Sequence, residues 1–114
     1  MPRVPSDSLY GTLNLLILRV LQDGPLHGLA IQRRLHDASD AALFVEEGAL
    51  YPALHRLEAD GLLTADWGTS DKNRKAKFYR LTAKGRRHLA RETAKWTAHA
   101  QAVLRTLGTE GSGR

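Results

Sequence analysis

The chain has 114 residues, of which 42% are hydrophobic and 25% are charged, and it contains no cysteine. This length corresponds to one domain, and the lack of cysteine excludes disulfides, thiolate metal sites and cysteine nucleophiles. The net charge of +5 is uneven, because residues 1–60 hold five Lys or Arg against eight Asp or Glu, whereas residues 61–114 hold twelve against four. A basic excess confined to the second half points to a polyanionic partner such as nucleic acid, and a solvated basic helix face is the plainer alternative.

No segment approaches the ~20 consecutive apolar residues of a membrane-spanning helix. The apolar segment 9–21 is interrupted by Asn14 and Arg19 and is not followed by a small-residue cleavage site. We therefore interpret it as a buried helix and not as a signal peptide. The sequence predicts a cytoplasmic protein without membrane contact.

Residues 1–7 contain two prolines and few apolar side chains, so we expect an N-terminal arm there. The spacing of leucine, isoleucine and valine then predicts a first helix from Ser8 to Gln22, which Asp23-Gly24-Pro25 ends. This helix is apolar over most of its circumference. It should therefore be central in the domain or covered by a second subunit.

A short second helix is predicted from His27 to Asp37. It should turn three apolar side chains inward, namely Leu29, Ile31 and Leu35. Residues 38–45 connect it to the third helix, and Leu43-Phe44-Val45 fits a brief strand.

The segment from Gly48 to Gly61 has two different faces when it is wound as a helix. One face is apolar and must cover a core: Leu50, Ala53, Leu54 and Leu57. The other face suits insertion into a groove better than solvation, because its residues are small or can form hydrogen bonds: Gly48, Pro52, His55 and Ala59, flanked by Tyr51 and Arg56. A proline beyond the first turn removes a backbone hydrogen bond. Either the regular helix begins near Gly48, or Pro52 kinks its first turn.

Two paired strands are predicted next, from Leu62 to Thr69 and from Lys77 to Thr82, with a polar turn between them. Four cations lie within a span of six residues at this turn: Lys72, Arg74, Lys75 and Lys77. Such a dense cluster at a hairpin tip suits contacts with phosphates or with the minor groove. The plainer interpretation, a solvated loop that is disordered in the free protein, is compatible with ordering on a nucleic acid.

A last helix is predicted from Ala83 to Leu107, with Thr82 as its cap and Gly85 costing little if the first turn frays. Side chains spaced four and three residues apart draw one narrow stripe along it: Leu89, Thr93, Trp96, Ala100, Val103 and Leu107. The stripe predicts a partner helix, because no further part of the domain is left to cover it. We therefore expect a homodimer, with residues 108–114 as a flexible tail.

Three motifs together resemble the PadR family of transcriptional regulators, in its short form with a single C-terminal helix. They are Pro25-Leu-His-Gly28, Gly48-Ala-Leu-Tyr-Pro52 with Leu57-Glu-Ala-Asp-Gly-Leu-Leu63, and Lys77-Phe-Tyr-Arg-Leu-Thr82 with Gly85. The resemblance covers residues 8–107. It implies a mainly α fold with a small β hairpin, in which a winged helix-turn-helix DNA-binding domain spans residues 8–82 and a dimerisation helix spans residues 83–107.

The resemblance also implies roles for single residues. Tyr51 would meet the phosphate backbone, and His55 or Arg56 would lie nearer the base edges of double-stranded DNA. Trp96, with parts of the first helix, is by resemblance the candidate site for a planar hydrophobic small-molecule effector in a cavity between subunits. The alternative for Trp96 is simple packing in the core or the dimer interface.

The histidines lack zinc-ligand spacing, and we find no arrangement of Ser, His and Asp, no phosphate-binding glycine loop and no paired inward carboxylates. We therefore expect no enzyme, no metal and no cofactor. The sequence favours a homodimeric transcriptional repressor that leaves a pseudo-palindromic operator when a small molecule alters the dimer. The alternatives are a winged-helix domain that binds an acidic protein and a carrier of planar ligands with no role on DNA.

Overall fold

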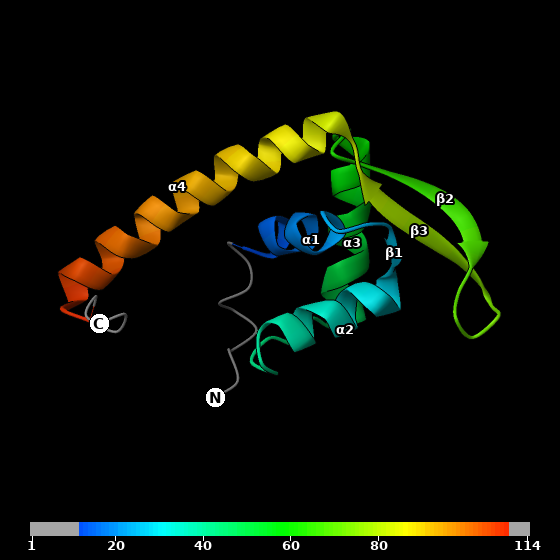
Figure 1. Cartoon of the computed structure of the whole chain (residues 1–114), viewed down its shortest axis with the longest axis horizontal. Helices are drawn as coiled ribbons and strands as arrows, with labels where there is room; N and C mark the ends of the chain where they lie inside the picture. The colour runs from blue at the N-terminus through cyan, green and yellow to red at the C-terminus, as the bar shows by residue number, and fades with distance from the viewer. Residues whose placement is uncertain (1–11, 110–114) are drawn as a thin grey trace.

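Three short helices pack against a small antiparallel sheet, and a fourth, long helix leaves this assembly at one corner (Figure 1). The computed structural model describes residues 12–109, so the expected arm 1–7 and residues 110–114 of the expected tail lie outside the described residues. The elements in chain order are α1 (Leu13–Leu21), β1 (Leu26–His27), α2 (Gly28–Ala38), α3 (Glu47–Ala59), β2 (Leu63–Thr69), β3 (Lys75–Leu81) and α4 (Ala83–Leu107). Between residues 12 and 109, no helix is both long and apolar enough to span a membrane. The predicted fold class, helix-rich with a small sheet, is confirmed.

Helix α1 is the centre of the core. It contacts α2, α3, β3 and α4, and more than half of its side chains are buried: Leu13, Ile17, Leu18, Val20 and Leu21. This agrees with the predicted central helix, because apolar side chains around most of a helix can be buried only when neighbours surround it. The described helix begins at Leu13 with Thr12 as its N-cap, and the predicted start at Ser8 lies outside the described residues.

The third strand of the sheet is not where the sequence placed it. Residues 43–45 form no strand, and β1 instead pairs with β3, which gives the sheet order β1-β3-β2. Segment 43–45 is held as a loop, because Val45 is buried in the core and its carbonyl accepts a hydrogen bond of 2.6 Å from Gln32 Nε2. The expectation of a brief strand there was wrong.

Helix α2 buries Ile31 and Leu35 as predicted, but Leu29 is 45% exposed. Two residues along an α-helix correspond to a rotation of about 200°, so Leu29 and Ile31 cannot both face the same core. The prediction that Leu29 points inward was therefore wrong, and this side chain is free to line a surface hollow.

The hairpin of β2 and β3 pairs Leu63 with Leu81 at its base and Thr69 with Lys75 near its tip. Strand β3 begins at Lys75, two residues before the predicted Lys77. The turn is shorter than predicted because the Ser70 N–H donates to the Arg74 carbonyl over 2.8 Å and Asn73 takes a left-handed φ of 59°. Lys75 therefore belongs to a strand and not to the turn.

Helix α4 begins at Ala83, as predicted, and the Thr82 side chain accepts a hydrogen bond of 2.9 Å from the Gly85 N–H. Position 85 requires glycine more strictly than the sequence suggested. A Cβ at this position would lie 3.1 Å from the Leu62 carbonyl carbon, closer still to its oxygen, and 3.3 Å from Leu81 Cδ2. Only glycine lets the first turn of α4 pack this closely on the sheet.

We therefore expect Gly85→Ala to lower the free energy of unfolding by about 1–3 kcal/mol, the usual cost of overpacking. Gly48→Ala is the matched control, because a Cβ at Gly48 would meet nothing within 4 Å. It should leave the stability unchanged or raise it by up to ~1 kcal/mol, since alanine has the higher helix propensity. Urea denaturation followed by circular dichroism measures both, and equal stabilities of the two variants would refute the close packing.

Candidate nucleic-acid interface

Helix α3 has the two faces that the sequence predicted. Its apolar side chains are buried: Leu50, Ala53, Leu54 and Leu57. The opposite face is exposed to solvent: Gly48, Tyr51, Pro52, His55, Arg56 and Ala59. The buried face holds the helix against α1, α2 and β2, so the exposed residues are presented on a rigid element.

Pro52 lies inside a continuous helix. The helix begins at Glu47, with Glu46 as its N-cap, and continues through Pro52 to Ala59. Pro52 supplies no N–H to the carbonyl four residues earlier, which is that of Gly48. Because both residues are exposed, water can satisfy this carbonyl, and the proline costs less than it would in a buried helix. The alternative of a helix that begins close to Gly48 is therefore nearer to the structure than a kinked first turn.

A hollow of about 480 Å³ lies between α3, the start of α2 and the hairpin. Its lining includes most of the predicted contact residues: Tyr51, His55, Lys72, Arg74, Lys75 and Lys77. Gly48, Pro52 and Arg56 do not line it, although all three are exposed on α3. The tertiary structure thus brings the groove-facing helix and the basic hairpin together around one concave surface.

Tyr51 is positioned by close contact with the first residue of α2. A Cβ at Gly28 would lie 2.7–2.8 Å from two atoms of the Tyr51 ring, so the ring can occupy this place only because residue 28 is glycine. The Tyr51 hydroxyl consequently lies beside the start of α2, while 37% of the residue is exposed. A side chain placed in this way can donate to an anion that lies over both helices.

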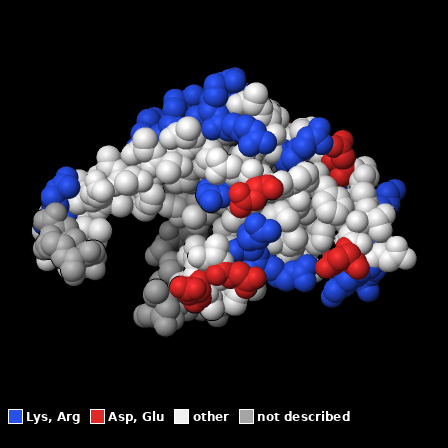
Figure 2. Space-filling view, in the orientation of Figure 1, with Lys and Arg blue, Asp and Glu red and all other residues white. Residues whose placement is uncertain are grey.

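The four predicted hairpin cations fall into two groups. Lys77 is engaged, because its Nζ lies 3.2 Å from Glu58 Oε1 of α3 and 5.5 Å from the centre of the Tyr79 ring. Lys75 Nζ lies 5.2 Å from the centre of the Trp67 ring. Lys72 and Arg74 are exposed at the turn and are not part of any ion pair in the described part of the chain. Figure 2 shows basic side chains around this end of the hairpin.

Tyr79 fills the base of the hairpin with a buried aromatic side chain. It is one of the largest fully buried side chains, and burial raises the pKa of its phenol, an effect that nearby Lys77 partly opposes. The phenol is therefore neutral at physiological pH. The charge of Lys77 is balanced by Glu58 and not by Tyr79, which leaves the tip cations as those available to a ligand.

The lining residues that sequence reasoning did not predict include His27, Leu29 and Trp67. Trp67 is 66% exposed although it is a large aromatic residue, and it lies directly opposite Lys77 in the hairpin register. His27 caps α2 through its Nδ1, which accepts from the Ala30 N–H over 3.3 Å, and its ring lies edge-on to Phe78. The pairing of the strands could have revealed Trp67, because residues directly opposite each other lie on the same face of a sheet, and Trp67 is opposite the predicted contact residue Lys77.

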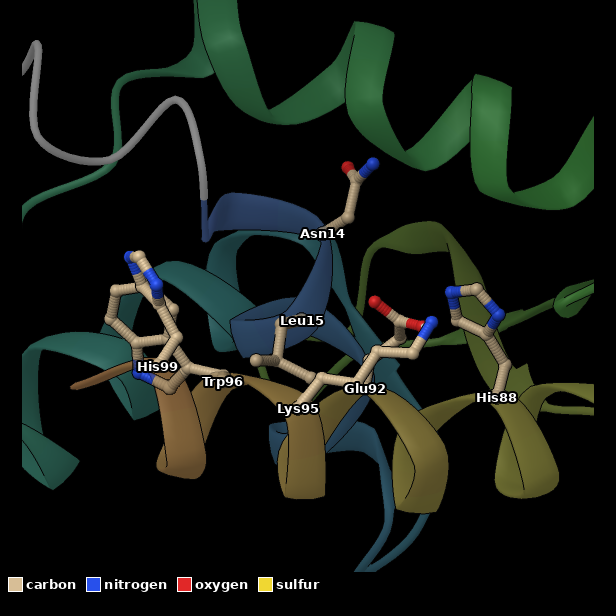
Figure 3. A pocket seen from close by; sticks show the side chains of 7 residues that line it. All are labelled: Asn14, Leu15, His88, Glu92, Lys95, Trp96 and His99. Carbon is tan, nitrogen blue, oxygen red and sulfur yellow. The ribbon is translucent and has the colours of Figure 1, made fainter. Parts of the chain in front are cut away.

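A second hollow, of about 350 Å³, lies between α1 and α4 (Figure 3). Its lining comes from Asn14 and Leu15 of α1 and from five residues of α4: His88, Glu92, Lys95, Trp96 and His99. Trp96 is 45% exposed, and its ring lies 5.5 Å from that of His99 at an angle of 43°. The sequence placed a candidate ligand site at Trp96 with parts of the first helix, and these two elements do meet there.

The predicted stripe on α4 divides into two parts. Leu89 is buried in the core of its own chain, so it docks α4 onto the domain and is not available to a partner. Beyond it, the large apolar side chains are exposed: Trp96, Val103 and Leu107, together with Leu104, which the prediction omitted. Thr93 is exposed and Ala100 is half-buried.

The family model described as the PadR-like family of transcriptional regulators matches residues 17–91. The chain belongs to the PadR-like family. Its relatives include the transcriptional regulator Rv3488 of Mycobacterium tuberculosis, which is 37% identical over 92 residues, or 81% of this chain and 82% of that protein. The resemblance inferred from the three motifs is confirmed.

Solved structures of PadR regulators have the same architecture. The PadR-family regulator of Eggerthella lenta is 33% identical, with a TM-score of 0.76 over 90% of this chain and 88% of that one. The PadR-like regulator of Bacillus cereus is 27% identical, with a TM-score of 0.77 over 90% and 97% of the two chains. The predicted winged helix-turn-helix with a C-terminal helix is therefore confirmed. The family match includes all of α3 and the hairpin, whereas Trp96 and the distal part of α4 lie beyond it.

Proposed function

We propose that the protein is a homodimeric repressor that binds a pseudo-palindromic operator and releases it when a small molecule binds. The observation that carries this proposal is the concave surface on which the exposed face of α3 and the basic hairpin meet. A helix with small residues in the middle of its outer face can approach base edges closely, and cations beside it can neutralise the flanking phosphates. The family membership supports DNA as the ligand of this surface.

In the proposed complex, the N-terminal half of α3 enters the major groove. Gly48 and Pro52 are small enough for a close approach of the backbone, Tyr51 bonds a phosphate, and His55 and Arg56 face base edges. The hairpin tip, with Lys72, Arg74 and Lys75, lies against the neighbouring phosphates or in the minor groove. Lys77 supports this arrangement indirectly, because its ion pair with Glu58 ties the hairpin to α3.

The proposed partner in the dimer is a second copy of this chain. Helix α4 extends beyond the domain (Figure 1), and its distal half leaves large apolar side chains exposed to solvent. Pairing with a second copy would remove Trp96, Val103 and Leu107 from water, with Thr93 and Ala100 along the same contact. A two-fold axis would then set the two α3 helices about one turn of DNA apart, roughly 34 Å.

The proposed effector site is the hollow between α1 and α4. Trp96 offers a flat surface for a planar aromatic ligand, and the tilted ring of His99 lies beside it (Figure 3). A ligand placed there touches both the helix at the centre of the domain and the helix that carries the dimer contact. It would change the angle between these helices and hence the spacing of the two α3 helices.

The DNA role is tested by neutralising the hairpin cations in Lys72→Ala/Arg74→Ala. This variant should bind all duplexes more weakly and reduce the slope of log K against log salt by about 2, because two cations that meet phosphates are removed. His55→Ala/Arg56→Ala should instead lower the preference for a selected operator over random duplex by about 1–3 kcal/mol for each base that these side chains read. Fluorescence anisotropy measures both, and Arg33→Ala, an exposed change on α2, is the charge control.

A wild-type protein that shows no preference for any duplex selected from a random pool, even at low salt, would contradict the operator proposal. It would favour a winged domain that binds an acidic protein. Unchanged affinity of the hairpin variant would leave a ligand carrier without a DNA role as the better interpretation.

The dimer is tested by Val103→Lys/Leu107→Lys. Two buried lysines cannot be accommodated in an apolar helix contact, so light scattering should give the mass of a monomer at concentrations where the wild-type protein is dimeric. The control is Ala98→Lys/Ala102→Lys, which adds the same charges to exposed positions about half a turn away on the same helix. A dimer that survives the first pair as well as the second would refute this contact.

The effector site is tested by tryptophan fluorescence in a Trp67→Phe background, which leaves Trp96 as the only indole. A planar aromatic dye should quench this fluorescence, and it should weaken operator binding in the same concentration range. Trp96→Ala should abolish dye binding, followed in this variant by the anisotropy of the dye itself, and should abolish the effect of the dye on DNA. Because Trp96 also lies in the proposed dimer contact, light scattering and operator affinity without dye are measured on the same variant to separate loss of the ligand site from loss of the dimer. Release of DNA by the dye in the Trp96→Ala variant would contradict the proposed site.

A further inference from the structure

We propose that the first half of α4 carries a second nucleic-acid surface, which holds the backbone of a separate duplex. Its residues are Lys84, Arg87, Arg91 and Lys95, named here the α4 basic row. Together with the operator surface, the row would let one protein bridge two DNA segments. The bridging of two duplexes rests on the proposed operator binding, whereas DNA binding by the row does not depend on it.

The spacing of the row places its four cations on one side of the helix. Steps of three, four and four residues keep side chains in register along an α-helix, and the row is about 16 Å long at 1.5 Å per residue. All four residues are exposed. Figure 2 shows the result, with Lys and Arg gathered along the edge of the molecule that carries the first half of α4.

The two arginines in the middle of the row, Arg87 and Arg91, face away from the rest of their own chain, whereas Lys84 contacts Asp60 and Lys95 borders the hollow between α1 and α4. Gly85 and Leu89 mark the side of α4 that is buried against the domain. Arg87 follows Gly85 by two residues, and Arg91 follows Leu89 by two residues. Each arginine therefore lies about 200° round the helix from the buried side. The exposed apolar side chains Trp96 and Val103 lie on the buried side of the helix by the same spacing, so a dimer formed through them would leave the row open to solvent.

The charges of the row are largely unbalanced. Arg87 and Arg91 take part in no ion pair or side-chain hydrogen bond in the described part of the chain. Lys84 Nζ donates to the neutral carbonyl of Asp60 over 2.8 Å, and only Lys95 has an acidic partner, Glu92, at 3.3 Å. Four cations with one nearby carboxylate form a surface that attracts a polyanion.

The composition of the row favours a nucleic-acid backbone over an acidic protein. Stable protein interfaces depend on aromatic or other large apolar residues at their centre. The residues beside the row on its outer side are Ala83, Ala90 and Ala94, which supply no such anchor. Binding through charge alone is characteristic of phosphate contacts, and arginine matches phosphate geometry through two parallel hydrogen bonds.

The row and the operator surface point in different directions, so they need different duplexes. The Lys84 contact fixes the start of α4 at the C-terminal end of α3, whereas Tyr51 and Pro52 lie in the N-terminal half of that helix, which is about 20 Å long. In Figure 1 the hairpin tip and α2 lie below α4, and the basic edge in Figure 2 is the upper one. A straight duplex in the groove-facing surface would not reach the row.

The test is a capture experiment with the full chain. One duplex, selected by the wild-type protein from a random pool, is immobilised and saturated with protein, and a second, random-sequence duplex with a fluorescent label is added. We expect capture of the second duplex by the wild type and a decrease of at least roughly tenfold in Arg87→Glu/Arg91→Glu, with a smaller salt slope for this capture. Arg86→Glu is the matched control, because Arg86 is also exposed and has no ion pair within residues 12–109, but lies about 100° round the helix from Arg87.

Operator affinity is measured separately by anisotropy and should stay within about twofold of wild type in all variants, since one duplex does not reach both surfaces. Three outcomes would overturn the proposal: no capture by the wild type, an equal decrease in the control, or a parallel decrease of operator affinity. Stronger competition by an acidic polypeptide than by duplex of equal charge would also overturn it, in favour of a protein partner. If no operator can be selected, binding of the random duplex is measured directly by anisotropy. Binding that is lost in Arg87→Glu/Arg91→Glu and kept in Arg86→Glu then contradicts the proposed function and supports the row.

Discussion

The junction where α3 ends and α4 begins is the constraint on which the other parts of the molecule depend. The Leu62 carbonyl accepts the Thr82 N–H over 3.1 Å and lies directly against Gly85. The Thr82 hydroxyl donates to the Gly61 carbonyl over 2.6 Å while it accepts from the Gly85 N–H. One threonine thus closes the sheet, caps the long helix and binds Gly61, two residues after the end of the groove-facing helix. A side chain at position 85 would separate these elements.

This junction gives a physical route between the two candidate sites. The hollow at Trp96 lies between α1 and α4, and α4 is fixed to the end of α3 through Thr82 and Lys84. Helix α1 in turn contacts α3 directly in the core. A ligand that moves α4 relative to α1 must therefore either strain the junction or move α3 with it. Close-packed interiors favour the second response, since they shift as units and do not deform continuously.

Some surface cations form ion pairs within the chain and others do not, and composition alone does not distinguish the two kinds. Lys77 forms an ion pair with Glu58, and Arg80 on the outer face of the hairpin forms one with Asp66. In the described part of the chain, Lys72 and Arg74 at the tip, and Arg87 and Arg91 on α4, have no acidic partner. The basic excess of the second half of the chain is therefore partly structural, and much of the remainder lies on two surfaces that face in different directions.

The sequence by itself determined the order of the helices, the hairpin, both faces of α3 and the span of α4, because each depends on local periodicity and on turn and cap residues such as Thr82 and Gly61. It could not place β1, which is only two residues long and exists through pairing with β3. It also misassigned Leu29, Leu89 and Gly85, whose surroundings come from distant parts of the chain. Only the tertiary structure decided which apolar residues remain exposed and which cations remain unpaired, because burial and ion pairing are contacts between elements that local spacing does not specify.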